Sequence, residues 1–215
     1  MEHGIDPEDK IKQSNAHADV LMKLNSKNQS LYRNRAIQNI TYAEFLMEDG
    51  RDPSDFIKKA LDDVKILIDM NDKSEHGYYY LALAKYVSAR LDVNQHKDPS
   101  TDIESGIVAA RRGQALTPEG AGCFVAEARL LRIRAESSPP GQARLASVRG
   151  AQAAARTAVQ LEPDDTNAWL ELARVQQLMA GTRAGQAAAP ELLAGVQAAD
   201  RAIKINPQLA QAHAV

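Results

Sequence analysis

The sequence repeats itself at an almost constant interval, and this repeat constrains the fold more than any other feature. A short segment that stops a helix, made of an apolar residue, a polar residue and then proline or another helix-stopping residue, occurs five times. Its third positions are Ser26, Asp72, Pro118, Pro163 and Pro207, which lie 46, 46, 45 and 44 residues apart. Self-similarity at such a period is typical of solenoids built from stacked units. The chain is therefore expected to be a repeat array.

Each repeat carries the pattern of two packed helices. Six residues after each stop comes a ring and, in the first four repeats, an alanine follows four residues later, so that both share one helix face and the alanine lets a neighbouring helix approach. The rings are Tyr32, Tyr78, Phe124 and Trp169, with His213 in the fifth position. A stripe of mostly small residues spaced by seven precedes each stop and predicts a second helix that faces the first. We interpret the four aromatic rings as core residues.

We name the two helices of a unit A and B. The A helices are predicted at 28–48, 74–91, 120–136 and 165–181, and the B helices at 54–70, 100–116, 143–161 and 189–205. Helix breakers such as Gly50-Arg51-Asp52-Pro53 separate A from B. Because one pair alone would leave an apolar face exposed, successive pairs should stack into an all-α superhelical solenoid.

The whole chain, 1–215, is predicted to be one array. It comprises a partial unit at 1–26, units at 26–72, 72–118, 118–163 and 163–207, and the start of a further unit at 208–215. Since Gly4-Ile5-Asp6-Pro7 lies 46 residues before the matching loop at 50–53, the chain begins inside a unit, and it also ends inside one. We therefore expect a fragment of a longer protein, whose uncovered C-terminal edge at Ile203 and Ile205 invites self-association.

The fourth repeat carries the resemblance to a known family. The run Ala168-Trp169-Leu170-Glu171-Leu172-Ala173, with Ala202 and Pro207 closing the next helix, resembles the tetratricopeptide repeat. The resemblance implies a right-handed superhelix of antiparallel helix pairs. Its usual unit has 34 residues, and the units here are longer between A and B. The loop pattern Gly-x-Asp-Pro is similar to that of elongated arrays attached to large bacterial serine/threonine kinases. HEAT and armadillo arrays have units of similar length and remain the rival fold.

Composition narrows the partners and the compartment. The formal net charge is −2 and charged residues make up 25% of the chain, so there is no basic surface of the kind that binds nucleic acid or anionic lipid. With one cysteine, Cys123, an internal disulfide is impossible, which favours a reducing compartment. No stretch approaches the length of an apolar membrane span. We expect a cytoplasmic protein that binds neither nucleic acid nor membrane.

A search for catalytic motifs finds none. The sequence has no phosphate-binding glycine loop, no His-Glu-x-x-His and no Gly-x-Ser-x-Gly elbow. The five histidines have no spacing that would bring them together around a metal. We therefore predict that the chain is not an enzyme and has no catalytic residue, metal site or cofactor.

The resemblance implies a binding groove on the concave wall. In that family, A-helix residues one, two, five and eight positions after the ring line the groove, and tyrosine and arginine are residues that commonly anchor partners. The candidate peptide-binding residues are Arg33, Asn34, Tyr79, Tyr80, Tyr86, Arg129, Arg132 and Arg174. The family's two-carboxylate clamp fits poorly, because Ile37, Tyr80 and Ala126 stand where asparagines and a further cation are needed.

Two functions remain open at this stage. The first is a non-catalytic scaffold that binds an extended, acidic peptide or a partner protein in its groove, as part of a larger bacterial regulatory protein. The second is a ligand-sensing regulatory domain whose superhelix changes shape when a peptide or small molecule binds. Ligand-dependent compaction would distinguish the second from the first.

Overall fold

The structure is a computed structural model that describes residues 7–182 and 188–208. These ranges contain nine helices and no strand, so the expected all-α class is confirmed. The helices are α1 (Glu8–Leu24), α2 (Gln29–Glu48), α3 (Ser54–Met70), α4 (Glu75–Asn94), α5 (Ser100–Leu116), α6 (Gly122–Ser137), α7 (Gln142–Leu161), α8 (Thr166–Gly181) and α9 (Ala189–Ile205). The expected ends at 1–6 and 209–215, with His213, lie outside the described residues.

The predicted A and B helices are the observed ones, with ends that differ by no more than three residues. Local chemistry explains where they begin. Asp52 and Asp98 each stand before a proline, and each carboxylate accepts hydrogen bonds from the backbone N–H and hydroxyl of the serine that opens α3 or α5. The hydrogen bonds from Ser54 and Ser100 lower the pKa of both carboxyls. The same loop chemistry therefore starts two successive B helices.

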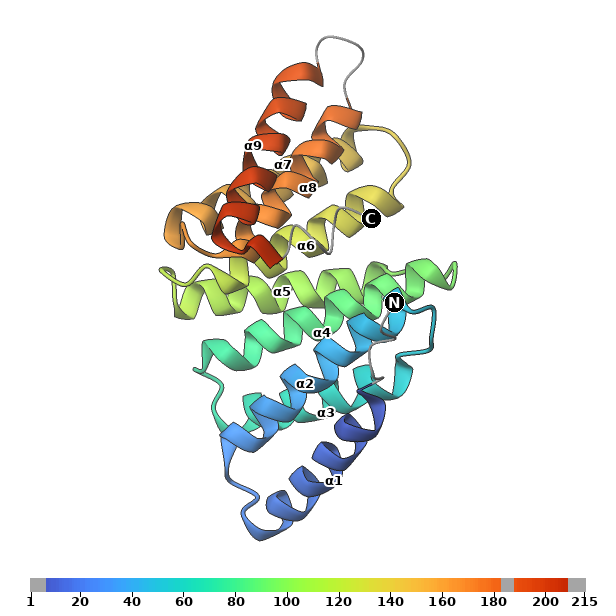
Figure 1. Ribbon diagram of the computed structural model, residues 1–215, viewed down its shortest axis with the longest axis vertical. Helices are drawn as coiled ribbons and strands as arrows, with labels where there is room; N and C mark the ends of the chain where they lie inside the picture. The colour runs from blue at the N-terminus through green and yellow to red at the C-terminus, as the bar shows by residue number, and fades with distance from the viewer. Residues whose placement is uncertain (1–6, 183–187, 209–215) are drawn as a thin grey trace.

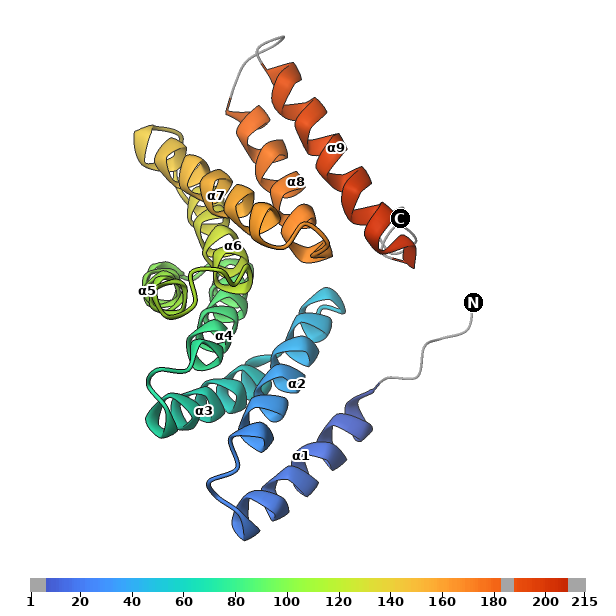
Figure 2. The ribbon, with the colours of Figure 1, turned by 90° about the vertical axis from the view of Figure 1, so that its left-hand side faces the viewer.

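The helices form a curved double layer (Figure 1, Figure 2). Each A helix packs against its own B helix, and the A helices α2, α4, α6 and α8 also contact one another in sequence. The B helices α3, α5 and α7 make no such contact with one another in the described part of the chain. The layer therefore curves with its A helices on the inside, and in Figure 2 the concave side opens to the right between α2 and α8, with α4 and α6 to the left of them.

Small residues allow the helices of successive pairs to pack closely, whereas the stripe was expected to face the first helix of its own pair. Gly113 of α5 lies against Cys123 of α6 so closely that a Cβ at position 113 would collide with the Cys123 sulfur. Gly106, seven residues earlier, is backed by Leu130, whose methyl carbons would lie 2.8 and 2.9 Å from a Cβ. Leu130 is fully buried. The contact between α5 and α6 therefore depends on the absence of side chains at both glycines.

Gly113→Ala is expected to lower the free energy of unfolding by about 1–3 kcal/mol, because the added methyl group overpacks the contact with Cys123. Removing the sulfur in the double variant Gly113→Ala/Cys123→Ala should restore most of that loss, since alanine also favours the helix. Urea denaturation of the native chain, both single variants and the double variant measures the coupling. Additive effects of the two substitutions would contradict the contact.

The aromatic rings are less buried than the sequence interpretation held. Tyr32 is buried, whereas Tyr78, Phe124 and Trp169 are only partly so. Phe124 and Trp169 pack against a core cluster with one side, and the Trp169 indole N–H donates to the carbonyl of Pro163 at 2.7 Å. The interpretation of all four rings as core residues was therefore wrong for three of them, which keep part of their surface exposed.

Polar pairs connect neighbouring helices at the junctions. Asn15 of α1 donates to Asn39 of α2 at 2.9 Å, and Gln152 of α7 donates to Gln176 of α8 at 2.9 Å. Arg35, nine residues after its stop, pairs with Asp19, seven residues before that stop. The equivalent positions around Pro118 hold Arg111 and Glu127, which pair at 2.8 Å with the charges exchanged.

Candidate functional site

The concave face carries two adjacent hollows, which together we call the groove. The first, of about 320 Å³, is lined by Ile37, Ile40, Thr41, Glu44, Tyr79, Tyr80, Leu83, Gly122, Val125, Arg129, Asp165 and Asn167. The second, of about 400 Å³, is lined by Glu44, Glu48, Tyr86, Arg90, Arg129, Arg132, Asn167, Leu170 and Arg174. We name them the apolar hollow and the charged hollow. Because Glu44, Arg129 and Asn167 line both, the two hollows are adjacent.

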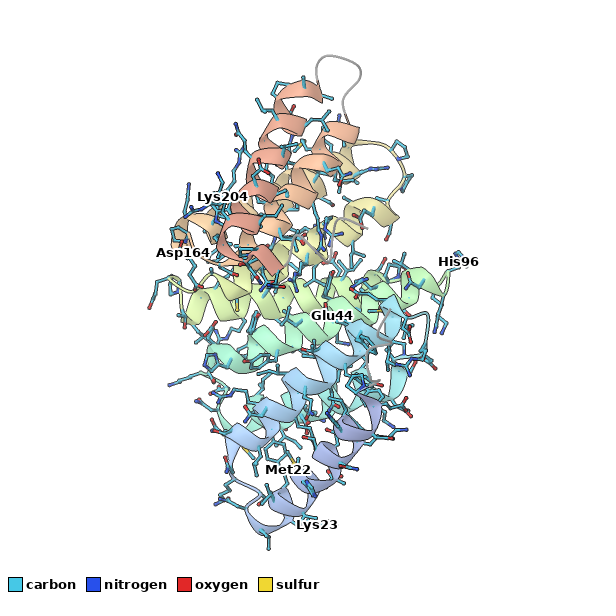
Figure 3. All side chains as sticks on the ribbon, in the orientation of Figure 1. Met22, Lys23, Glu44, His96, Asp164 and Lys204 are labelled. Atoms are coloured by element: carbon cyan, nitrogen blue, oxygen red, sulfur yellow. The ribbon has the colours of Figure 1, made fainter. Side chains whose placement is uncertain are left out.

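All four A helices contribute to the groove. On α4 the lining residues Tyr79, Leu83, Tyr86 and Arg90 follow at steps of four, three and four, which keeps them on one helix face. The α2 wall is built the same way, and Glu44 on that wall is labelled near the middle of the molecule in Figure 3. The helix period therefore brings residues from α2, α4, α6 and α8 to one surface.

The structure brings six of the eight candidate residues together. Tyr79 and Tyr80 line the apolar hollow, Tyr86, Arg132 and Arg174 line the charged hollow, and Arg129 lines both. Arg33 and Asn34 line neither hollow. Burial raises the pKa of Tyr80, and the nearby positive charge of Arg33 opposes that rise. Arg33 thus lies beside the groove.

The sequence reasoning missed several groove residues. They are Thr41, Glu44, Glu48, Arg90, Gly122, Asp165 and Asn167. Glu44 and Arg90 occupy the same position, twelve residues after Tyr32 and Tyr78. That position continues the groove face by one further turn on α2 and α4, each of which has 20 residues. The length of the predicted helices could therefore have shown that Glu44 and Arg90 belong to the groove face.

Two tyrosines form the floor of the apolar hollow. The ring centroids of Tyr79 and Tyr80 are 5.0 Å apart, and Gly122 lies so close that a Cβ there would be 3.1 Å from the Tyr79 ring. Burial raises the pKa of Tyr79 to about 12, so its hydroxyl stays protonated at neutral pH. Together with Ile37 and Leu83 the rings offer an apolar surface with hydroxyl groups in it.

In the charged hollow two arginines, Arg90 and Arg129, make cation–π contacts with the ring of Tyr86. The Arg90 and Arg129 guanidinium carbons lie 5.7 and 5.5 Å from the ring centre of the buried Tyr86. Arg129 donates to Asn167 at 3.4 Å, and its buried Nε has no hydrogen-bond partner among the described residues. Within residues 7–182 and 188–208, neither arginine pairs with a carboxylate. Both charges are therefore fixed in place without being neutralised, which suits an anionic group.

Arg132 has a different environment from the other arginines. Only 12% of its side chain is exposed, and its Nε lies 2.7 Å from the Glu171 carboxylate, which is 0% exposed. Burial opposes its charge, but Glu171 and Glu136 outweigh that effect and raise the pKa of Arg132. Glu171, which the sequence analysis placed on the groove wall by position, is instead buried between α6 and α8. Arg132 therefore connects two repeats, and its charge is already neutralised.

Proteins of known structure share this arrangement of helices. No family model matches the sequence, and no curated protein does. The structure aligns with the crystal structure of MamA over 98% of each chain, at 14% identity and a TM-score of 0.51. It aligns with TTC0263, a thermophilic TPR (tetratricopeptide-repeat) protein in Thermus thermophilus, over 95% of this chain and 100% of that one, at 16% identity and a TM-score of 0.53. The chain has the tetratricopeptide-repeat fold.

A weaker likeness involves an RNA-containing structure. A human IFIT1 dimer with PPP-AAAA aligns with 86% of the tetratricopeptide array and covers 46% of its own chain, at 12% identity and a TM-score of 0.41. At that score we draw nothing from it. The exclusion of nucleic acid made from the net charge therefore stays a prediction.

The remaining chemistry of the array lies outside the groove. Cys123 is buried, and its burial together with the nearby Glu75 raises the pKa of the thiol to about 12. In the described ranges, no cluster of three histidine, cysteine or acidic side chains has the arrangement of a metal site. None of the helices in those ranges has the length and apolar character needed to cross a membrane.

Proposed function

We propose that the tetratricopeptide array is a non-catalytic module that holds an extended, acidic segment of a partner protein in its groove. One observation supports this most directly: the Arg90 and Arg129 charges are fixed on Tyr86 without a carboxylate partner in the described residues, next to a hollow lined by tyrosines and aliphatic side chains. Guanidinium groups pair with carboxylates, and rigid rings supply apolar contact at little entropic cost. The fold presents both on one concave surface.

The finer parts of the proposal rest on the sequence. A protein partner is favoured over nucleic acid or lipid because the net charge is −2 and because Glu44, Glu48 and Asp165 would repel the continuous negative charge of a polyphosphate more strongly than one acidic side chain held by the arginines. The loop resemblance supports a place within a larger bacterial regulatory protein that contains a kinase domain. We also propose a cytoplasmic location, which the single cysteine favours because it leaves no internal disulfide to form.

The double variant Arg90→Gln/Arg129→Gln is expected to weaken binding of the natural partner by at least about tenfold, because two charge-assisted contacts are lost. The partner is captured from lysate of the source cells with the native array, identified by mass spectrometry, purified and measured by calorimetry. Binding to the native array should also weaken with salt, since exposed charges are screened beyond about 8 Å at physiological ionic strength.

Arg149→Gln/Arg156→Gln is the matched control, because it removes the same charge from two exposed positions of α7. Arg132 is left unchanged in both variants, because substituting it would remove the ion pair with the buried Glu171 and destabilise the fold. Equal affinity of the groove variant and the control for the partner would place the interface elsewhere.

A regulatory domain that changes shape is the second candidate, and one observation favours it. Glu44 and Glu48 of α2 line the charged hollow together with Arg129 and Arg174 of α6 and α8, yet none of these carboxylates forms an ion pair with them in the described residues. Closure of the superhelix would bring these carboxylates into ion pairs with the arginines. Small-angle scattering with and without the partner distinguishes a compacting sensor from a static scaffold.

Self-association through α9 is the remaining expectation. Its exposed apolar residues are Leu192, Leu193, Val196 and Ile203, whereas Ile205 is only partly exposed. We expect Val196→Glu/Ile203→Glu to reduce the sedimentation-derived association constant of the isolated array by about tenfold or more, because each charge would have to be desolvated in the contact. A native array that stays monomeric at millimolar concentration in analytical ultracentrifugation would contradict the expectation.

A further inference from the structure

The two hollows of the groove follow one another along the A helices. On α4 the apolar hollow is lined by Tyr79 and Leu83 and the charged hollow by Tyr86 and Arg90. On α6 the step from Val125 to Arg132 is also seven residues. At about 1.5 Å of rise per residue, seven residues separate the two hollows by about 10 Å. A ligand that fills both must therefore run along the A helices for at least that distance.

The apolar hollow can take up an aliphatic or aromatic side chain against the apolar part of its lining, which Ile37, Leu83 and the tyrosine rings provide. Ile37, with 37% of its surface exposed, faces the tyrosines and Leu83 across the hollow. Covering these apolar surfaces removes them from water, at about 25 cal/mol for each Å² buried. The charged residues that line this hollow are Glu44, Asp165 and Arg129, and the two carboxylates disfavour an acidic group there.

The charged hollow has arginines on one side and carboxylates on the other, so only the arginine side favours an anion. Arg90 and Arg129 present their guanidinium groups from α4 and α6, and Arg174 adds a third from α8, 3.8 Å from Glu171. Glu44 and Glu48 occupy the α2 side and repel an anion from there. An acidic group is therefore directed toward the α4 and α6 side of the hollow, over Tyr86.

We propose that the ligand is an extended peptide with an apolar side chain in the apolar hollow and an acidic side chain about three residues away in the charged hollow. An extended chain advances about 3.3 Å per residue, so three residues span the distance between the hollows. This inference rests on the proposed function and adds to it the identity and spacing of the two anchoring side chains. Since Arg129 and Asn167 line both hollows, a peptide that occupies both passes these two side chains.

The test is selection of random nonapeptides, displayed on phage, against the immobilised full chain. Enriched sequences are expected to pair an apolar residue with Asp or Glu two to four positions away, at least about tenfold above the frequency in the unselected library. Selection on Arg90→Gln/Arg129→Gln should lose the enrichment of the acidic residue and keep that of the apolar one. Selection on Ile37→Asn should lose the enrichment of the apolar residue and keep that of the acidic one. The control Val108→Asn, at an exposed position of α5, should enrich the same peptides as the native chain.

Three outcomes would overturn the inference. Peptides that depend on the groove residues but show no preferred spacing would refute it and leave the proposed function standing. Peptides enriched equally on the native chain and on both groove variants would refute the inference and the proposed function together. A selection that enriches no sequence above the bare support would also refute the inference, since two preformed hollows would then hold no short peptide.

Discussion

Arg132→Met is expected to lower the free energy of unfolding by about 3–5 kcal/mol, because it leaves the buried Glu171 carboxylate with only the longer contact to Arg174, at 3.8 Å. A carboxylate that is 0% exposed cannot regain the hydration it loses on folding. Urea denaturation followed by circular dichroism measures the loss. Hydrogen exchange should locate it in α6 and α8, and leave α1 to α3 nearly unchanged, because solenoid units contact only their neighbours.

The double variant Arg132→Met/Glu171→Met separates the charge from the packing. Replacing both partners of a buried ion pair by apolar residues of similar volume is often neutral or stabilising. The double variant should therefore recover most of the loss caused by Arg132→Met alone. A double variant as unstable as the single one would show that the arginine stabilises the array by packing and not by neutralising Glu171.

Arg35→Met is expected to cost a similar amount, about 3–5 kcal/mol at neutral pH, and the cost should depend on pH. Arg35 donates to both oxygens of Asp63, at 2.7 and 2.5 Å, and this carboxylate is 0% exposed. Burial already raises the pKa of Asp63 in the native chain, and Arg35 opposes that rise. Without Arg35 the pKa should rise further, so that the buried carboxyl takes up a proton.

The sign of the pH dependence follows from that proton. The folded variant binds it more tightly than the unfolded chain, whose aspartates have a pKa of about 3.9, so stability is gained as the pH falls toward that value. The difference in unfolding free energy between the native chain and Arg35→Met should therefore be smaller at pH 5 than at pH 8. For Arg35→Met/Asp63→Asn the difference should not change between these two pH values, and a parallel change there would assign the effect to another group.

The helices and their pairing could be predicted from the sequence because strong local signals mark them. The proline and aspartate before Ser54 and Ser100 end one helix and start the next, whatever the tertiary context. The predicted helix ends were therefore close to the observed ones. The seven-residue stripe with Gly106 and Gly113 likewise depends on backbone proximity, which only small residues permit. These features belong to single helices or to adjacent pairs.

The groove could be predicted only in part because it depends on contacts between units. Glu171 and Leu170 are neighbours in sequence, yet one is buried against Arg132 and the other lines the charged hollow. Position in the repeat does not show which of the two side chains is buried. The packing of α6 against α8 determines it. Glu44 and Arg90 escaped notice because the usual unit of 34 residues was applied to longer helices.

The charged pairs Arg35–Asp19 and Arg111–Glu127 would disfavour an exchange of the repeats that contain them. Repeats of similar sequence tend to misassemble, because each could dock against a neighbour that is not its own. A copy of the first unit placed after α5 would set the equivalent of Arg35 against Arg111, two like charges at a contact where the present chain has Glu127. Duplication or exchange of these units during evolution would thus require compensating changes of charge, and the native succession is distinguished from its permutations during folding.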